Sequence, residues 1–329
     1  MASPRPLTLL EPLPAGLHQA LDRIRQAMDA LGNVVVAYSG GVDSSLVAAI
    51  AAERLGERAL AITGVSAALA PHLLEEARCQ ASWLGLHYRE IPTAELADPN
   101  YSNNPPDRCY ACKRELHGLL AQIRSNAGAT QVLDGVNLDD LQDHRPGLRA
   151  ARESNVRSPL AEAGVDKSGV RQLSRALGLP WWDKPAQPCL ASRFPYGEPI
   201  TASRLQRVGA AEAWLRKQGF AEVRVRSQGE SARVELPANQ LGSVCQSLAS
   251  SSLREEMVEA FRGLGFNAVA LDLEGLVSGK LNRDLPGPGT TGSRLSPEVC
   301  IQNETLRPPS NWDPDHPGPH PEGSHGGSW

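Results

Sequence analysis

The segment VVVAYSGGVDSSLVAAIA at 34–51 contains residue types that can bind an anion. Two glycines, Gly40 and Gly41, stand between a β-branched run and an alanine-rich run. Four polar side chains lie beside them: Ser39, Asp43, Ser44 and Ser45. Glycines let backbone N–H groups turn inward without a Cβ, and a following helix start adds unpaired donors and partial positive charge. The alternative is a tight turn with a polar cap. We favour a phosphate site, because the glycines stand directly between an expected strand and a long expected helix.

A second polar segment, DGVNLDDLQDHR at 134–145, follows another expected strand. Its amide and carboxylate side chains include Asn137, Asp139 and Asp140. They would meet a nucleotide, metal or substrate at the end of that strand, or they form a polar loop with a helix cap. The first loop also lacks the Gly-Lys-Ser/Thr of a Walker A motif, so a different type of phosphate loop is indicated.

The cysteines form two groups that suggest chemistry. Six cysteines in 329 residues are too few for a disulfide scaffold. Cys189 lies in a proline-interrupted loop, shortly before Ser192 and Arg193, and a thiol flanked by cations and hydroxyls ionises more readily than one in an apolar core. Cys109 and Cys112 form a Cys-x-x-Cys within RCYACK. Such a pair indicates metal binding, redox chemistry, or two helical thiols that share a face by accident.

Two arginines occupy alternate positions of an expected strand. Arg224 and Arg226, in VRVRS, therefore lie on the same face of that strand. They form either a solvated face or an anion site, since the guanidinium fork suits bidentate binding.

The elements that must position these residues alternate along the chain. Apolar spacing predicts a helix over 17–31, a strand over 34–38 and a helix from near Ser44. Further strands are expected at 59–65, 87–91 and 131–136, and further helices at 71–85, 110–126 and 166–178. This order predicts an α/β fold with a doubly wound, mostly parallel sheet, whose ligand binds beyond the carboxyl ends of the strands.

The pattern changes from about Tyr196. A helix is expected over 201–218, an antiparallel strand pair at 221–227 and 232–237, and a helix near 238–263. The predicted organisation is a nucleotide-binding domain over 15–195, a smaller α+β substrate or oligomerisation domain over 196–284, and a disordered tail over 285–329. The tail is rich in Pro, Gly, Ser and His and cannot bury enough apolar surface to fold.

The overall composition limits the partners. A formal net charge of −4 argues against nucleic-acid binding through a large positive surface. We find no continuous apolar segment of membrane-spanning length, and the sequence predicts a cytoplasmic protein without a membrane partner. We also expect a homo-oligomer.

The motifs together resemble a known family. Segment 39–45 resembles the PP-loop of the adenine nucleotide α-hydrolase-like superfamily. With DGVNLDD, RPGLRAA, KPAQPCLASRFPYG and SGKLNR in order, the sequence is similar to the LarE family of ATP-dependent sulfur transferases, over about residues 15–284. The block around Cys189 is the most specific part of this resemblance.

The resemblance implies cleavage of ATP between its α and β phosphates, with Asp43 helping to place Mg²⁺. Segment 39–45 would grip pyrophosphate, while AMP goes to a carboxylate of pyridinium-3,5-biscarboxylic acid mononucleotide. That carboxylate becomes a thiocarboxylate, on the way to the ligand of a nickel-pincer cofactor. The resemblance also implies a pocket for the substrate phosphate made by Ser192, Arg193, Glu212, Arg224 and Arg226.

Two sulfur routes follow from the resemblance. In the simplest, Cys189 gives up its own sulfur and is left as dehydroalanine. In the other, Cys109, Cys112 and Cys189 hold a [4Fe–4S] cluster, and its open iron binds exogenous sulfide or another sulfur donor. We favour the cluster, because the chain carries the extra cysteine pair; a zinc site would need a fourth ligand.

Other functions compete with sulfur transfer to a mononucleotide. A PP-loop tRNA thiolase would need a basic RNA-binding appendage, and an amide-forming synthetase would need a glutaminase domain or partner. A nucleotide-binding sensor would hold ATP without chemistry, and it would not require Asp43 or the cysteines.

Overall fold

The computed structural model describes residues 4–126, 128, 131–142, 146–250, 252–277 and 279–284. The chain groups into two compact units, Met1–Asn282 and Arg283–Trp329. The predicted tail at 285–329 lies outside the described residues. The boundary near residue 195, within the first unit, remains a prediction.

Four parallel strands form the larger sheet, in the order β3-β2-β1-β4. They are β1 (Val34–Ala37), β2 (Ala59–Val65), β3 (His87–Pro92) and β4 (Gln131–Leu133). Every neighbouring pair in this sheet is parallel. The predicted α/β fold with a mostly parallel sheet is therefore confirmed.

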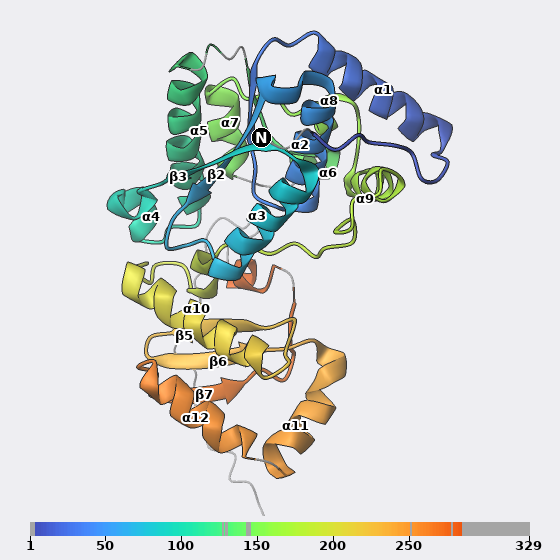
Figure 1. Cartoon of the computed structure of the whole chain (residues 1–329). Helices are drawn as coiled ribbons and strands as arrows, with labels where there is room; N and C mark the ends of the chain where they lie inside the picture. The colour runs from blue at the N-terminus through green and yellow to red at the C-terminus, as the bar shows by residue number, and fades with distance from the viewer. Residues whose placement is uncertain are drawn as a thin grey trace, which may run out of the picture. The chain divides into compact units, whose positions relative to one another are not determined.

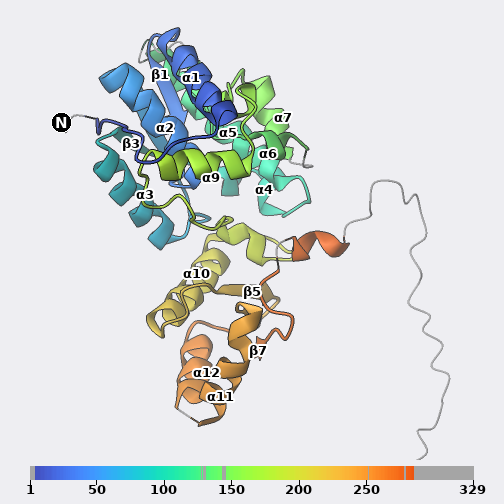
Figure 2. The same ribbon diagram turned by 90° about the vertical axis from the view of Figure 1, so that its right-hand side faces the viewer.

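Helices surround this sheet (Figures 1 and 2). The five predicted helices begin close to the expected residues, whereas the short helices at 99–102, 138–142, 146–153 and 159–162 were not predicted. They are α1 (Ala15–Asp29), α2 (Val42–Leu55), α3 (Pro71–Leu84), α4 (Pro99–Ser102), α5 (Arg108–Asn126), α6 (Leu138–Gln142), α7 (Pro146–Glu153), α8 (Pro159–Glu162) and α9 (Lys167–Ala176). Strand β4 ends earlier than predicted, because the Asp134 carboxylate accepts the Val136 N–H at 3.1 Å and turns the chain.

The central strand β1 is buried on both faces. Val34 and Val36 pack in one cluster with residues of α1, α2 and α9, whereas Val35 packs in another cluster with Leu120 of α5. Because successive strand side chains point to opposite faces, a continuous valine run suits a strand covered on both sides. This burial fixes the end of β1, where the glycine loop begins.

A smaller three-stranded sheet follows, with α10 (Ala202–Lys217) beside it (Figure 2). Its strands are β5 (Arg224–Gln228), β6 (Ser231–Glu235) and β7 (Ala268–Leu271). The predicted antiparallel pair is confirmed, with Val225 opposite Val234, and β7 adds in parallel to β6.

The prediction of a single helix near 238–263 is wrong. The chain instead forms a short 3₁₀ turn at Ala238–Gln240, then α11 (Leu241–Ser250) and α12 (Leu253–Gly263). A run of serines at 250–252 separates the two helices. Serine hydroxyls compete for backbone hydrogen bonds, which weakens a helix interior.

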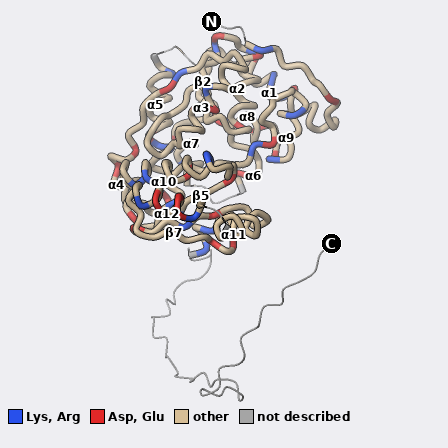
Figure 3. Tube along the Cα trace, turned by 60° about the horizontal axis from the view of Figure 1, so that its bottom comes forward, with Lys and Arg blue, Asp and Glu red and all other residues tan. Residues whose placement is uncertain are grey.

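Acidic and basic residues are interspersed along the chain (Figure 3). Within the part of the chain that the structure describes, no helix is both long enough and apolar enough to cross a membrane. The predicted cytoplasmic location and homo-oligomer remain predictions.

Candidate functional site

The loop between β1 and α2 closes on itself through two serine hydroxyls. The Oγ atoms of Ser39 and Ser44 lie 3.1 Å apart, and the Ser39 N–H donates to Ser44 Oγ at 3.2 Å. Gly40 has a φ of 68°, and a Cβ there would lie 2.9 Å from Cα of Ala77 on α3. Only glycine suits this position, because it tolerates positive φ and has no side chain to strike the neighbouring helix.

This loop lines a cavity of about 410 Å³. Ser39, Gly41 and Asp43 contribute to the lining, at the start of α2 where helical N–H groups lack helical acceptors. Gly40, Ser44 and Ser45 are not among the lining residues. Ser45 is buried and donates to Gln80 Oε1 at 3.0 Å, so its hydroxyl fixes α2 against α3.

Asp43 is held from two directions. Its Oδ1 accepts from Asn137 Nδ2 at 3.0 Å, and its Oδ2 lies 2.5 Å from Nζ of Lys167. The structure thus joins the glycine loop, the acidic loop after β4 and the start of α9. Asp43 presents its carboxylate to the cavity as an oxygen ligand of the kind Mg²⁺ prefers.

The acidic loop acts on the cavity indirectly. Asp139 Oδ2 accepts the backbone N–H of Lys167 at 3.0 Å, and Asp140 Oδ2 accepts the N–H of Asn137 at 3.1 Å. Neither aspartate lines the cavity. Of the predicted residues in this loop, only Asn137 reaches Asp43, and the two aspartates hold the elements that carry Asn137 and Lys167.

A close backbone contact sets the distance between this loop and α2. A Cβ on Gly135 would lie 2.6 Å from the Ser44 nitrogen and 2.9 Å from the Asp43 carbonyl carbon. Because real Cβ atoms do not approach so closely, the first turn of α2 packs directly on the backbone after β4.

Two lysines that the sequence interpretation missed carry positive charge to the cavity. Lys167 and Lys184 both line it. Lys184 Nζ donates to the Gly40 carbonyl at 3.1 Å and lies 2.5 Å from Oε2 of Glu76. Lys184 stands in the block that resembles the LarE family, which was the available signal. Lys167 follows Asp166, the residue that caps α9, and nothing in its local sequence marked it.

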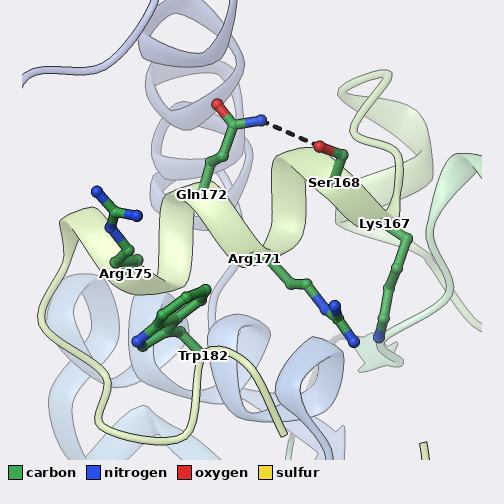
Figure 4. A pocket seen from close by; sticks show the side chains of 6 residues that line it. All are labelled: Lys167, Ser168, Arg171, Gln172, Arg175 and Trp182. Atoms are coloured by element: carbon green, nitrogen blue, oxygen red, sulfur yellow. Dashed lines mark hydrogen bonds between the residues drawn. The ribbon is translucent and has the colours of Figure 1, made fainter. Parts of the chain in front are cut away.

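Lys167 also lines a second hollow, along α9 (Figure 4). The other lining residues are Ser168, Arg171, Gln172, Arg175 and Trp182. In Figure 4, Lys167 and Arg171 extend from the same side of α9, while Gln172 bonds Ser168 at 3.1 Å. This hollow has no thiol or carboxylate in its lining, so the cavity at the glycine loop is the candidate active site.

All three predicted active-site thiols line the cavity at the glycine loop. They are Cys109 and Cys112 in the first turns of α5, and Cys189 just before the 3₁₀ turn Leu190–Arg193. Burial, then the charge of Glu95, raises the pKa of the Cys112 thiol from its ordinary 9.0 to about 12. Within the described residues, no three His, Cys, Asp or Glu side chains come close enough to hold one metal ion. The donors for a cluster share the cavity, but they do not form a closed ligand set.

The loop that carries Cys189 is held by a buried arginine. Arg193 Nη1 donates to the carbonyl of Pro188 at 2.9 Å and to that of Cys189 at 3.4 Å. Its Nε lies 2.7 Å from Oε1 of Glu212, which is fully buried. Burial of the Glu212 carboxyl opposes its ionisation, but Arg193 and the Val225 N–H keep its pKa below the ordinary 4.5.

The predicted phosphate residues lie together, and all of them except Arg224 are engaged with protein groups. Arg226 pairs with Glu235 and donates to the Ser192 carbonyl at 2.6 Å. Arg224 takes part in none of these bonds. Burial and the positive charges of Arg193 and Arg226 lower the pKa of Arg224. A bound anion beside Arg224 would therefore stabilise its charged form. These residues do not line the cavity that holds the thiols.

The parallel sheet, the glycine loop without a Walker lysine and the cavity at its end define a nucleotide-binding protein of the PP-loop class. A family model described as NAD synthase matches residues 17–108. A tRNA-specific 2-thiouridylase of Azorhizobium caulinodans is 33% identical over 46% of this chain and 48% of its own length.

Two relatives match most of the chain. An uncharacterized protein of Synechocystis is 52% identical over 82% of this chain and 99% of its own length. The pyridinium-3,5-bisthiocarboxylic acid mononucleotide synthase of Lactiplantibacillus plantarum is 37% identical over 79% of this chain and 92% of its own length. The chain belongs to the LarE family, that of pyridinium-3,5-bisthiocarboxylic acid mononucleotide synthases. PP-loop membership implies that it is an enzyme that uses ATP and Mg²⁺.

Proposed function

We propose that the protein is an AMP-forming sulfur transferase that converts the carboxylates of pyridinium-3,5-biscarboxylic acid mononucleotide into thiocarboxylates, for nickel-pincer cofactor biosynthesis. One observation carries this proposal: a single cavity is lined by the phosphate-loop residues Ser39 and Gly41 and by Cys189. Activation and sulfur transfer must share a site, because the acyl-adenylate reacts readily with water. The synthase of L. plantarum supports this substrate.

In the first step, a carboxylate oxygen of the substrate attacks the α-phosphorus of ATP, and pyrophosphate leaves. The start of α2 and the Gly41 N–H would receive the pyrophosphate charge. Asp43 would hold Mg²⁺, which supplies charge neutralisation on the leaving phosphates. Lys167 and Lys184, at the edge of the same cavity, add two positive charges.

In the second step, the Cys189 thiolate attacks the acyl carbon and the bond to AMP breaks, so AMP leaves with the electron pair. In the simplest route, loss of the Cys189 Cα proton then breaks its Cβ–S bond. The products are a thiocarboxylate and a dehydroalanine at position 189. The sulfur thus comes from the protein, and each chain transfers it once.

A repeating route would use the cysteine pair. We propose as the alternative that Cys109, Cys112 and Cys189 hold a [4Fe–4S] cluster that binds a further sulfide. The shared cavity supports this alternative. The lack of a three-residue metal group within the described residues does not. No step above therefore depends on the cluster.

The substrate phosphate would bind beside β5. In this proposal Arg224 makes the contact, since Arg193 and Arg226 are engaged with Glu212 and Glu235. The positive charges of those two arginines would attract the substrate phosphate, and the Ser192 hydroxyl would help to position it. A tRNA substrate is the second candidate, favoured by the similarity to the A. caulinodans thiouridylase over 46% of this chain and 48% of that protein.

The test is an assay with anaerobically purified protein, ATP, Mg²⁺ and the dicarboxylate mononucleotide. We expect substrate-dependent AMP and pyrophosphate, and a thiocarboxylate product. Cys189→Ala should lose the product but keep ATP–pyrophosphate exchange, whereas Cys79→Ala, an exposed thiol on α3, should keep both. Absence of substrate-dependent AMP, or thiolation of tRNA instead, would contradict the proposal.

Mass and iron analysis of the same sample separates the two sulfur routes. The sacrificial route predicts that each turnover removes the mass of one H₂S at Cys189 from iron-free protein. The cluster route predicts about four bound irons per chain and an unchanged mass of Cys189 after several turnovers with added sulfide.

A further inference from the structure

A buried arginine in the cavity has, within the described part of the chain, no counter-ion at hydrogen-bond distance, and its guanidinium lies over the Tyr196 ring, 5.1 Å from the ring centroid. Arg108, the first residue of α5, is 4% exposed and lines the cavity. Its Nε and Nη1 atoms have no hydrogen-bond acceptor, and no acid among the described residues forms an ion pair with it. A guanidinium stays charged in proteins, and a buried charge without a counter-ion destabilises the fold. Glu95, a buried carboxylate of the same cavity, accepts from Ser66 and makes no ion pair with Arg108, so the Nε and Nη1 donors are available to an anionic ligand.

A second unpaired donor lines the same cavity. The side chain of Tyr101, on α4, is 2% exposed, and its hydroxyl has no hydrogen-bond partner. Burial and then the charges of Cys189 and Cys112 raise the pKa of this phenol, while the charge of Arg108 acts in the opposite direction. The hydroxyl is thus a neutral donor that lies near both the thiols and the guanidinium.

We propose that Arg108 and Tyr101 form a subsite for a carboxylate of the substrate. A planar carboxylate has two oxygens that accept several bonds, and the guanidinium and phenol together offer donors of the right number and geometry. Phosphate already has its own donors, at Gly41 and the start of α2. The inference rests on the proposed function, since it assigns one group of the proposed substrate.

The carboxylate held here is the one that does not react in that turnover. A carboxylate oxygen must attack the α-phosphorus of ATP, and a bond to a guanidinium would withdraw its electron density. Once adenylated, the reacting carboxylate has also lost its negative charge. The substrate carries a second carboxylate on the same ring, and a fixed cation in the cavity that Cys189 also lines would orient the ring so that the activated carboxylate faces Cys189.

The test compares two ligands by calorimetry: the dicarboxylate mononucleotide and a pyridinium-3-carboxylate mononucleotide that lacks the second carboxylate. We expect Arg108→Met to weaken binding of the dicarboxylate about 10- to 100-fold, as for loss of charge-assisted hydrogen bonds. Tyr101→Phe should have a smaller effect in the same direction. Neither variant should change the affinity for the monocarboxylate or for ATP. If the two residues had only a structural role, their loss would weaken the binding of all three ligands alike.

Two controls show that the variants are folded. Arg114→Met removes an exposed arginine of the same helix, paired with Asp98, and should leave both affinities unchanged. The melting temperature of ligand-free Arg108→Met should be equal to or above that of the wild type, because an uncompensated buried charge is removed. Arg108→Met should also lose the rise in melting temperature that pyridine-3,5-dicarboxylate gives the wild type.

The outcomes are distinguishable. If the wild type forms the thiocarboxylate but Arg108→Met still prefers the dicarboxylate as strongly, the subsite is wrong and the proposed function stands. If the wild type forms no thiocarboxylate, the proposed function fails. In that case, the subsite is still supported if pyridine-3,5-dicarboxylate raises the melting temperature of the wild type but not of Arg108→Met. If the compound does not raise the melting temperature of the wild type, the subsite is wrong as well.

Discussion

Nζ of Lys167, in the first turn of α9, lies 2.5 Å from Oδ2 of Asp43, in the first turn of α2, although 124 residues separate them in the sequence. Both residues of this ion pair line the cavity, and both side chains are partly exposed. It holds together the carboxylate suited to Mg²⁺ and a cation suited to a phosphate. Binding of a cation at Asp43 would free Lys167 to pair with a phosphate oxygen.

The first prediction concerns Lys167→Met. We expect substrate-dependent ATP–pyrophosphate exchange to fall about 10²- to 10³-fold, as for loss of one group that stabilises transition-state charge. Stability should change by less than about 1 kcal/mol, since the pair is partly exposed. Isotope exchange and thermal melting measure the two effects.

The matched control for Lys167 is Arg175→Gln, at the other end of α9. Arg175 pairs with Glu11 and does not line the cavity at the glycine loop. It should retain exchange at the wild-type rate. Equal loss in both variants would show that α9 acts only through its folding.

The second prediction concerns Gly135→Ala. The added Cβ would meet the Ser44 nitrogen at 2.6 Å, so the backbone after β4 must move away from α2. We expect a loss of about 1–3 kcal/mol of stability, as for other overpacked sites, together with weaker ATP binding. Gly118→Ala is the control, because no atom lies within 4 Å of its Cβ position on α5. There we expect a gain of about 0.5–1 kcal/mol from helix propensity, and unchanged ATP binding.

The third prediction concerns the buried pair that holds the Cys189 loop. Arg193→Met leaves the fully buried Glu212 without its main counter-charge, and we expect a loss of about 3–5 kcal/mol. The double variant Arg193→Met/Glu212→Gln should recover part of this loss. Chemical denaturation measures both, and equal stability of the single and double variants would show that the pair does not hold the loop.

The same pair predicts a pH dependence with a definite sign. The folded-state pKa of Glu212 lies below its ordinary value of 4.5, so the folded state favours the ionised form. The stability that it contributes is present above pH 4.5 and is lost as the pH falls through the lower folded pKa. Denaturation between pH 7 and pH 3 should show this loss in the wild type. The loss should be smaller in the double variant.

The fourth prediction concerns the reactivity of Cys112. With a pKa of about 12 in place of 9.0, the folded protein should hold about a thousandfold less Cys112 thiolate at pH 8 than the unfolded chain. Alkylation at Cys112, followed by mass spectrometry, should be correspondingly slow in buffer and fast in urea. The exposed thiol of Cys79 should be alkylated rapidly in the same sample, which controls for the activity of the reagent. Fast alkylation of native Cys112, which is half-buried and lines the cavity, would contradict the raised pKa.

Much of the fold could be predicted from local sequence. The valine run of β1 and the spacing of apolar residues in α1 and α10 determine the type of each element, because burial of one face requires that spacing. The serine break between α11 and α12 was missed, because the apolar pattern continues across it. The strand β7 and its parallel pairing with β6 depend on a partner far along the chain, which no local pattern contains.

The sequence by itself determined the glycine loop at 39–45, the order of elements that presents it and the three thiols for which we propose sulfur chemistry. These depend on residue type and on spacing within one segment. Only the tertiary structure decided that Lys167 meets Asp43, that Arg193 holds the Cys189 loop and that Arg108 is buried with no hydrogen-bond acceptor at Nε and Nη1. The physical reason is that burial and ion pairing depend on which distant segments pack together. The sequence states which side chains are charged, but the fold decides which opposite charge lies beside each of them.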